Sequence, residues 1–213
     1  MAKKLESTFI NMVIVLTIVS LVAAYSLASV FNLTKDPIAK AALNKKLQAI
    51  EQVIAPKDLK TKKTLPTAVD YDNDPFKDMY KLPAYDGLDT LEIYPAKKGD
   101  KVVAYAVKSM TMMGFSGLIE VMVGFKTDGT IITYSILKHA ETPGLGTKMT
   151  TWFNNEAKPT RCVNGKNPKT TKMQVSKDGG DIDAITAATI SSRAFLDAID
   201  RAYKTLEKGG KYE

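Results

Sequence analysis

The stretch KVVAYAVKSMTMMGFSGLIEVMVGFKTDGTIITYSILKH, residues 101–139, decides the fold class of this chain. Val, Ile and Tyr are concentrated in three segments that turn-forming residues separate: 101–110, 117–126 and 130–139. Branched and aromatic side chains suit a pleated, half-buried surface, so each segment is expected to form a strand. Asp128-Gly129 lies between the last two segments and is typical of a tight hairpin turn. Together with the apolar segment 91–95, these residues predict an antiparallel sheet.

A helix is expected after the sheet, near the C-terminus. From about Ser191 onwards apolar side chains recur at helical spacing, and Gly209 and Gly210 follow them as an end signal. The apolar positions are Phe195, Ile199, Ala202 or Tyr203, and Leu206. Residues 140–180 carry turn formers and little periodicity, and so long a loop in a compact domain is more often functional than idle. Sheet and helix together predict an α+β domain with an antiparallel-rich sheet and flanking helices.

The N-terminal region contains a candidate membrane helix at residues 9–31, FINMVIVLTIVSLVAAYSLASVF, which carries no charge. A helix of this length is about 34 Å long and crosses a hydrocarbon core of about 30 Å. A cleaved signal peptide is the alternative, because AYSLAS offers small residues near its end, but the apolar run is longer than a usual signal core. Lys3 and Lys4 favour a cytoplasmic N-terminus. We therefore expect a single-pass membrane protein whose domain lies outside the cytoplasm.

The segment between the membrane helix and the sheet, residues 32–89, is expected to hold a juxtamembrane helix and a connecting region. Asp36 suits an N-cap and Pro37 the first helical position, so a new helix is predicted to start there. Apolar residues then recur at helical spacing before Pro56, at Leu43, Leu47, Ile50 and Ile54. Residues 57–89 mix Lys, Asp, Pro and Gly and are expected to be irregular. The predicted organisation is a cytoplasmic N-terminus, a membrane helix, this linking region and the domain, at residues 1–8, 9–31, 32–89 and 90–213.

Composition narrows the classes of function. The 213 residues carry a formal net charge of +7, which suits anionic partners such as membrane lipid or a phosphate group. The basic residues are mostly dispersed lysines without a nucleic-acid module, so no nucleic acid partner is expected. One cysteine, Cys162, and one histidine, His139, exclude an internal disulfide and a site built from several such ligands, so no metal site is expected. No nucleophile-elbow sequence accompanies His139, which disfavours a hydrolase.

Residues 139–146, HAETPGLG, form the first stretch that ordinary packing does not require. They directly follow a predicted strand. Pro143, Gly144 and Gly146 favour a tight turn with accessible backbone amides, and glycine lets a ligand approach the main chain closely. An ordinary turn after a strand is the alternative reading.

Residues 181–195, DIDAITAATISSRAF, form the second such stretch, at the approach to the C-terminal helix. Helix N-termini leave N–H groups unpaired and carry partial positive charge, so they suit both hydroxyl caps and anions. Thr189, Ser191 and Ser192 are each possible N-caps, and Ala187 and Ala188 leave the approach sterically open. Composition favours capping, and phosphate binding stays open.

The two stretches together carry a resemblance. DAITAATISS, residues 183–192, resembles the flavinylation motif of FMN-binding domains in ion-pumping respiratory complexes, with Ala187 where that motif most often has Gly. HAETPGLG resembles a second signature of those domains, and residues 114–131 resemble their strand–turn–strand segment. With the membrane helix, the chain is similar over residues 5–207 to the G subunits of Rnf-type ion-translocating ferredoxin:NAD oxidoreductases. The related C subunits of sodium-pumping NADH:quinone reductases are the alternative.

The resemblance implies a covalent FMN whose phosphate is esterified to the Thr189 hydroxyl by a separate flavin transferase that uses FAD. It implies that the turn contributes five flavin-pocket residues, namely Glu141, Thr142, Gly144, Leu145 and Gly146. Thr186 and Ser191 are then expected to flank the phosphate, and Asp183 to serve recognition by the transferase. The methyl group of Ala187 is expected to crowd this approach slightly.

The function that the resemblance implies is that of a membrane-anchored electron-transfer subunit in an ion-translocating oxidoreductase of the bacterial cytoplasmic (inner) membrane. Its partners are then the other membrane subunits, the flavin transferase and membrane lipid, and complete turnover is not expected of the subunit alone. A non-flavinylated assembly subunit is the alternative from another class, and Ala187 is the feature in its favour. A secreted anion-binding domain is a third reading.

Overall fold

The computed structural model describes residues 8–56 and 67–210. The chain divides into two compact units, Met1–Asn44 and Lys45–Glu213. The expected cytoplasmic segment 1–8, including Lys3 and Lys4, lies outside the described residues except for Thr8.

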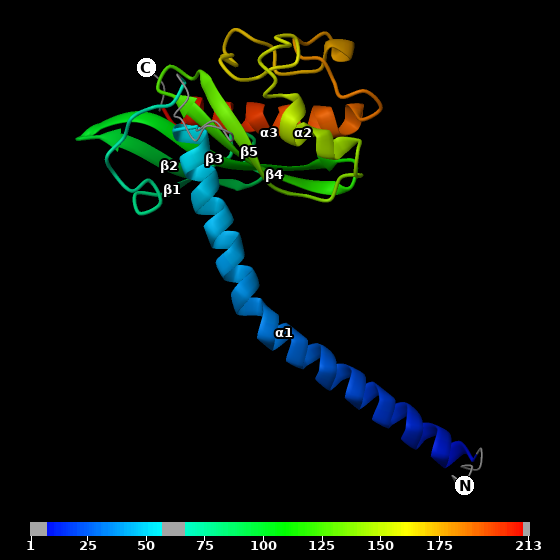
Figure 1. Cartoon of the computed structure of the whole chain (residues 1–213). Coiled ribbons are helices and arrows are strands. Elements are labelled where there is room, and N and C mark those ends of the chain that lie inside the picture. The colour runs from blue at the N-terminus through cyan, green and yellow to red at the C-terminus, as the bar shows by residue number, and fades with distance from the viewer. Residues whose placement is uncertain (1–7, 57–66, 211–213) are drawn as a thin grey trace. The chain divides into compact units, whose positions relative to one another are not determined.

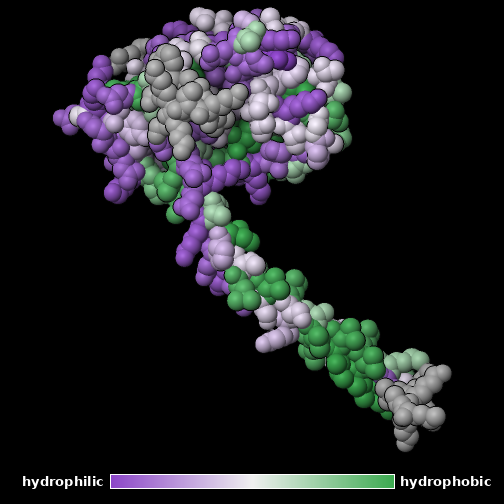
Figure 2. All heavy atoms as spheres, viewed as in Figure 1, coloured by the Kyte–Doolittle hydropathy of each residue, from purple (hydrophilic) through white to green (hydrophobic). Residues whose placement is uncertain are grey.

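Helix α1, Phe9–Ile54, begins at the first residue of the predicted membrane segment. The large apolar side chains of that segment are exposed, and Figure 2 shows hydrophobic residues covering the N-terminal part of the helix. Thr17, Ser20 and Ser26 each donate a hydrogen bond to the carbonyl four residues earlier, so their hydroxyls are satisfied within the helix. A helix with this length and apolar surface is able to cross a membrane.

The predicted helix start at Asp36 and Pro37 is wrong, because α1 runs through both residues without a break. A proline suits the φ angle of a helix and removes a single backbone hydrogen bond, and the turns on either side supply the remaining ones. The same dipeptide therefore occurs at helix starts and within long helices. The predicted end before Pro56 is confirmed, since α1 ends at Ile54.

Five antiparallel strands form one sheet in chain order, β1-β2-β3-β4-β5 (Figure 1). Their bounds are β1 Tyr80–Pro83, β2 Thr90–Lys98, β3 Lys101–Gly114, β4 Gly117–Lys126 and β5 Ile131–His139. The four predicted strands are confirmed. The predicted hairpin is confirmed as well: the Gly129 N–H donates to the Lys126 carbonyl at 3.0 Å, and the φ of Gly129 is 84°. Strand β1 went unpredicted because its four residues are too few to show alternation within a polar stretch.

Two hydrophobic clusters cover the two faces of the sheet. Alternate residues of a strand point to opposite faces, so the neighbours Tyr105 and Ala106 belong to different clusters. Helix α3, Thr189–Lys208, covers the first face and confirms the predicted C-terminal helix, which starts two residues earlier than expected. The second face is covered by the last turns of α1, through Ala49, Ile50, Val53 and Ile54. Leu47, from the same predicted stripe, stays 39% exposed.

The connection from β5 to α3 contains only short helical turns: η1 Gly146–Lys148, α2 Met149–Trp152 and η2 Ser176–Asp178. Figure 1 shows it folded beside α3. Its apolar residues belong to the same cluster as α3, among them Met149, Phe153, Val163, Val175 and Ile182. The stretch that the sequence marks as a long loop is therefore packed onto the core, and it holds both motif-bearing segments in place.

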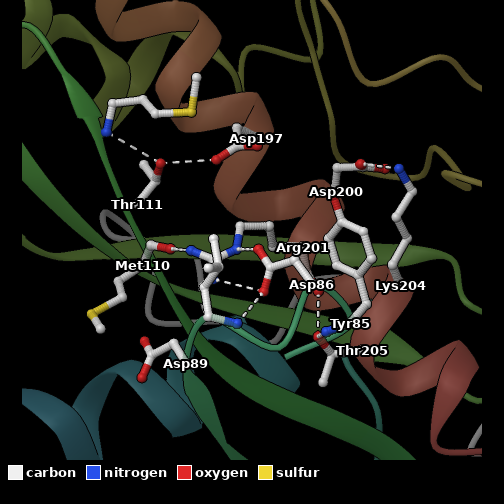
Figure 3. A network of polar contacts seen from close by, with 12 residues as sticks. Tyr85, Asp86, Asp89, Met110, Thr111, Asp197, Asp200, Arg201, Lys204 and Thr205 are labelled. Atoms are coloured by element: carbon white, nitrogen blue, oxygen red, sulfur yellow. Dashed lines mark hydrogen bonds and ion pairs between the residues drawn. The ribbon is translucent and has the colours of Figure 1, made fainter. Parts of the chain in front are cut away.

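Arg201 is nearly buried and links α3 to the sheet by polar contacts (Figure 3). Its guanidinium donates to the carbonyl of Met110 in β3 and forms an ion pair of 3.1 Å with Asp86, which precedes β2. Burial by itself would raise the pKa of the Asp86 carboxyl, but the Leu88 N–H and the Arg201 guanidinium together hold that pKa below its usual value. Asp86 is therefore ionised at neutral pH and stays paired.

Arg201→Met is expected to lower the free energy of unfolding by about 2 kcal/mol, because it leaves a carbonyl and a half-buried carboxylate without their shared donor. Urea denaturation measures the loss. Arg193→Met is the matched control, since Arg193 forms an exposed ion pair with Asp178 and such pairs contribute little. Because the pKa of Asp86 is depressed, the Arg201 effect is full above the ordinary aspartate pKa of about 3.9 and shrinks as the pH falls below it. Equal losses in the two variants would contradict the assignment.

Candidate functional site

Glu141, in the turn after β5, is the polar centre of the candidate site. Its side chain is only 4% exposed. One carboxylate oxygen accepts a hydrogen bond from Ser191 of α3 at 2.5 Å, and the other accepts from the backbone N–H of Ser116 at 3.1 Å. The backbone N–H of Glu141 donates to Nδ1 of His139 at 3.3 Å, so the single histidine accepts a hydrogen bond that stabilises the turn. Glu141 thus ties the 139–146 turn to the β3–β4 hairpin and to the start of α3.

The two glycines of this turn have different roles. Gly144 has a φ of 75°, a left-handed conformation that favours glycine, and a Cβ there would meet no atom within 4 Å. Gly146 is buried, and a Cβ on it would lie 2.6 Å from both the Glu141 carboxylate and the Ser191 hydroxyl. Gly144 therefore shapes the turn, whereas Gly146 lets the main chain approach the Glu141–Ser191 pair.

Helix α3 starts without a hydroxyl cap, so the expectation that Thr189, Ser191 or Ser192 caps it is wrong. The N-cap residue is Ala188, which has no side-chain cap hydrogen bond. Ala187, just before it, has a φ of 62° and is the one non-glycine residue of the described chain with a positive φ. The left-handed backbone explains why the related motif most often has Gly here. The difference at Ala187 is thus chiefly one of backbone strain.

The hydroxyls around the start of α3 are sorted by their partners. Ser191 is 2% exposed and donates to Glu141. Ser192 is fully buried, donates to the Ala188 carbonyl at 2.9 Å and accepts from the Ile185 N–H at 2.9 Å. Thr189 is half-buried, and within residues 8–56 and 67–210 its hydroxyl has no hydrogen-bond partner. Thr189 therefore presents an unengaged hydroxyl, whereas those of Ser191 and Ser192 are hydrogen-bonded.

A pocket of about 370 Å³, here called the apolar pocket, lies between the turn and α3. It is lined by Phe115, Glu141, Thr142, Leu145, Gly146 and residues 187–191. Apolar side chains form much of its rim, with Phe115 67% and Ile190 48% exposed. Exposed aromatic and aliphatic side chains around a concave site suit a flat, largely apolar ligand.

A second pocket of about 530 Å³, here called the basic pocket, lies on the other side of Thr189. It is lined by Trp152, Lys158, Thr160, Arg161, Ser176, Lys177, Thr189 and residues 183–187. The Arg161 guanidinium lies 4.1 Å from the centre of the Trp152 ring, and the Trp152 Nε1–H donates to the Asp183 carbonyl at 3.0 Å. Hydrogen bonds from Thr160 and from Ser176, the latter at 2.8 Å, lower the pKa of the Asp183 carboxyl.

Eight of the nine site residues predicted from the sequence line one or both of these pockets. Six of them line the apolar pocket: Glu141, Thr142, Leu145, Gly146, Thr189 and Ser191. Asp183 and Thr186 line the basic pocket, which Thr189 also borders. Gly144 lines neither pocket and instead shapes the turn, where its N–H donates to the Thr147 hydroxyl at 2.9 Å.

Sequence reasoning did not single out several residues of the site. Phe115 was visible only as part of a turn, and Ile190 only as a position between two hydroxyl residues. Lys158, Arg161 and Lys177 belong to the long loop, where no periodicity marks them. Folding of that loop against α3, rather than any local pattern, brings these cations to Thr189.

Ala187→Gly is expected to raise the free energy of unfolding by about 0.5 kcal/mol, because the left-handed conformation that it relieves costs an L-residue more than the chain entropy that glycine adds to the unfolded state. Ala188→Gly is the matched control: the φ of Ala188 is −139°, so glycine there adds chain entropy to the unfolded state and relieves no strain. Urea midpoints of the two variants should move in opposite directions. A loss of stability in Ala187→Gly would contradict the strain assignment.

Comparison with known proteins places this site in a family. Residues 114–204, which include both motif-bearing segments, match the FMN-binding domain family. The chain is 34% identical to the G subunit of the ion-translocating oxidoreductase complex of Cronobacter sakazakii, over 82% of this chain and 79% of that one. The corresponding Salmonella typhi protein is also 34% identical, over 83% of this chain and 81% of its own.

A further relative has a name that states its coupling ion. The G subunit of the Na(+)-translocating ferredoxin:NAD(+) oxidoreductase complex of Acetobacterium woodii is 31% identical over 92% of this chain and 91% of its own. An alignment over 92% of this chain includes part of the apolar helix as well as the domain. The chain is therefore a membrane protein with an FMN-binding domain and belongs to the family of the G subunits of ion-translocating oxidoreductase complexes.

Proposed function

We propose that the chain carries FMN covalently attached to Thr189 and transfers electrons within an ion-translocating ferredoxin:NAD-type oxidoreductase complex. The observation that carries the attachment is the Thr189 hydroxyl, which borders both pockets and has no hydrogen-bond partner in the part of the chain that the structure describes. Ser191 and Ser192 lie two and three residues further on, but their hydroxyls are buried and engaged. A phosphodiester on Thr189 therefore needs no rearrangement of the core.

The residues around Thr189 fit this cofactor. A phosphodiester keeps one negative charge, and the first turn of α3 offers unpaired N–H groups and the positive end of the helix dipole. The apolar pocket, with Phe115, Leu145 and Ile190, suits the isoalloxazine ring. A bound flavin supplies electron-transfer chemistry that the side chains lack, while the chain holds it and excludes water from one face.

The attachment step requires a flavin transferase and FAD. The Thr189 oxygen forms a bond to the phosphorus of the flavin half of FAD, the bond between the two phosphates breaks, and AMP leaves. The hydroxyl proton passes to a base of the transferase. Asp183, exposed and held beside Thr189, is suited to recognition by this enzyme.

The location proposed is the bacterial cytoplasmic membrane, with the domain on the extracytoplasmic side and α1 in contact with lipid. Other membrane subunits are the partners, because the relatives are named as subunits of complexes. The apolar rim of the pocket suits approach of a partner's redox centre. Electron transfer by this protein alone is limited to reduction and reoxidation of its flavin.

The test is co-expression of the full chain with and without a flavin transferase, followed by denaturing electrophoresis under ultraviolet light. Covalent flavin is expected only with the transferase. Trypsin cuts after Lys177 and Arg193, so the flavin should appear on the peptide 178–193 as the mass of one FMN less one water. Fragmentation of this peptide places the group on a single residue. An unlabelled chain after co-expression favours a non-flavinylated assembly subunit, for which the non-glycine Ala187 would be the marker.

A further inference from the structure

The basic pocket concentrates positive charge beside Thr189. Among the residues that line it, Lys158, Arg161 and Lys177 are cationic and Asp183 is the one carboxylate. Within residues 8–56 and 67–210 none of the three cations forms an ion pair of 4 Å or less. The pocket therefore has excess positive charge and attracts anions.

Arg161 is held ready for a ligand. Its guanidinium stacks on Trp152, and Trp152 is fixed in turn by its hydrogen bond to the Asp183 carbonyl. The Nε–H of Arg161 is buried and has no hydrogen-bond partner in the described part of the chain. Because Nε is buried, a ligand in the pocket would meet Arg161 as a charged group rather than through this nitrogen.

The Asp183 carboxylate offsets one of these three positive charges. One of its oxygens accepts a hydrogen bond from Ser176 at 2.8 Å, and the backbone N–H of Asp183 donates to the Thr160 carbonyl at 2.8 Å. These contacts hold Asp183 in the wall of the pocket. Two net positive charges therefore remain for a ligand, which matches a phosphate group.

The two pockets differ in whether their charge favours or opposes a bound phosphate. The apolar pocket contains the buried Glu141 carboxylate, which repels a phosphate. Thr189 and Ala187 line both pockets, so a ligand joined to Thr189 has access to either side. We propose that the basic pocket binds the phosphate group of the flavin nucleotide, with Arg161, Lys158 and Lys177 as its ligands, while the ring occupies the apolar pocket. The identity of the nucleotide rests on the proposed function, whereas the anion site does not.

Trp152 is the single tryptophan of the chain and reports directly on this pocket. The full chain, purified in detergent without exposure to a transferase, is titrated with inorganic phosphate at constant ionic strength in chloride. A saturable change in tryptophan fluorescence is expected. Arg161→Gln, Lys158→Gln and Lys177→Gln should each raise the phosphate Kd about tenfold, because each removes one charge-assisted contact. Lys138→Gln, an exposed lysine of β5 outside the pocket, should leave it unchanged.

A comparison of riboflavin with FMN distinguishes the contribution of the phosphate group to binding from that of the ring. The unlabelled chain is expected to bind FMN more tightly than riboflavin, and Lys158→Gln should reduce that difference. The two exposed lysine variants keep the test valid if Arg161→Gln fails to fold. A phosphate response no greater than that to chloride, or equal affinities in Lys158→Gln and Lys138→Gln, would overturn the proposal.

The outcome is separable from the proposed function. If phosphate binds as expected but peptide 178–193 carries no flavin after co-expression, the anion site stands and covalent attachment fails. If the peptide is labelled but phosphate does not bind, the attachment stands and this assignment of the basic pocket is overturned.

Discussion

Thr189→Ala is expected to abolish covalent flavin completely while the domain remains folded. The substitution removes the only oxygen to which the phosphate is proposed to attach. The stability change should be smaller than about 0.5 kcal/mol, because Ala188 and not Thr189 is the N-cap, the Thr189 hydroxyl has no partner within the described residues, and alanine is the better helix former. In-gel flavin fluorescence after co-expression measures the first effect, and urea denaturation the second.

Two serine variants make this result specific. Thr189→Ser keeps a hydroxyl at the same position and should retain labelling, although a primary hydroxyl changes the rate. Ser191→Ala retains Thr189 and should still be labelled, but it removes one of the two donors to the Glu141 carboxylate and should lose stability by about 1 kcal/mol. Fluorescence that survives in Thr189→Ala, or that disappears in Ser191→Ala without loss of fold, would move the attachment site to Ser191.

Gly146→Ala is expected to give the largest loss of stability of the substitutions considered, about 3 kcal/mol. The added methyl would lie 2.6 Å from both the Glu141 carboxylate and the Ser191 hydroxyl, and 2.8 Å from the Glu141 Cβ. These atoms are buried and cannot move aside without opening the junction between the turn and α3. Covalent labelling of Gly146→Ala should also decrease, because the same junction forms the wall of the apolar pocket.

Gly144→Ala is the matched control from the same turn. A methyl at Gly144 meets no atom within 4 Å, so the expected cost is only the left-handed backbone, about 1 kcal/mol. Thermal or urea denaturation of the two variants, together with their flavin content, gives the comparison. If both glycine variants lose the same stability, backbone conformation alone accounts for the motif and the close packing at Gly146 has no role.

The sequence predicted most strands and the hairpin turn because their conformations depend mainly on residues that are close together in the chain. The strands at 101–110 and 117–126 have enough branched and aromatic residues to show their alternation, and the turn at Asp128-Gly129 depends on two residues only. Strand β1 exists because β2 offers it a partner, which no four-residue pattern reveals. Pro37 shows the same limit, since the dipeptide Asp36-Pro37 is compatible with a helix start and with the interior of a long helix.

Sequence alone identified two segments of functional interest, the charge-free membrane helix and the hydroxyl-rich approach to α3, because composition and spacing are local properties. Among Thr189, Ser191 and Ser192, tertiary packing determines which hydroxyl has no hydrogen-bond partner within the described residues. Packing against Glu141 occupies Ser191, the Ile185–Ala188 turn occupies Ser192, and Thr189 is left between two pockets. The same folding brings Arg161 to Thr189 from a loop without periodicity, because contacts between segments distant in sequence depend on how the whole core is packed.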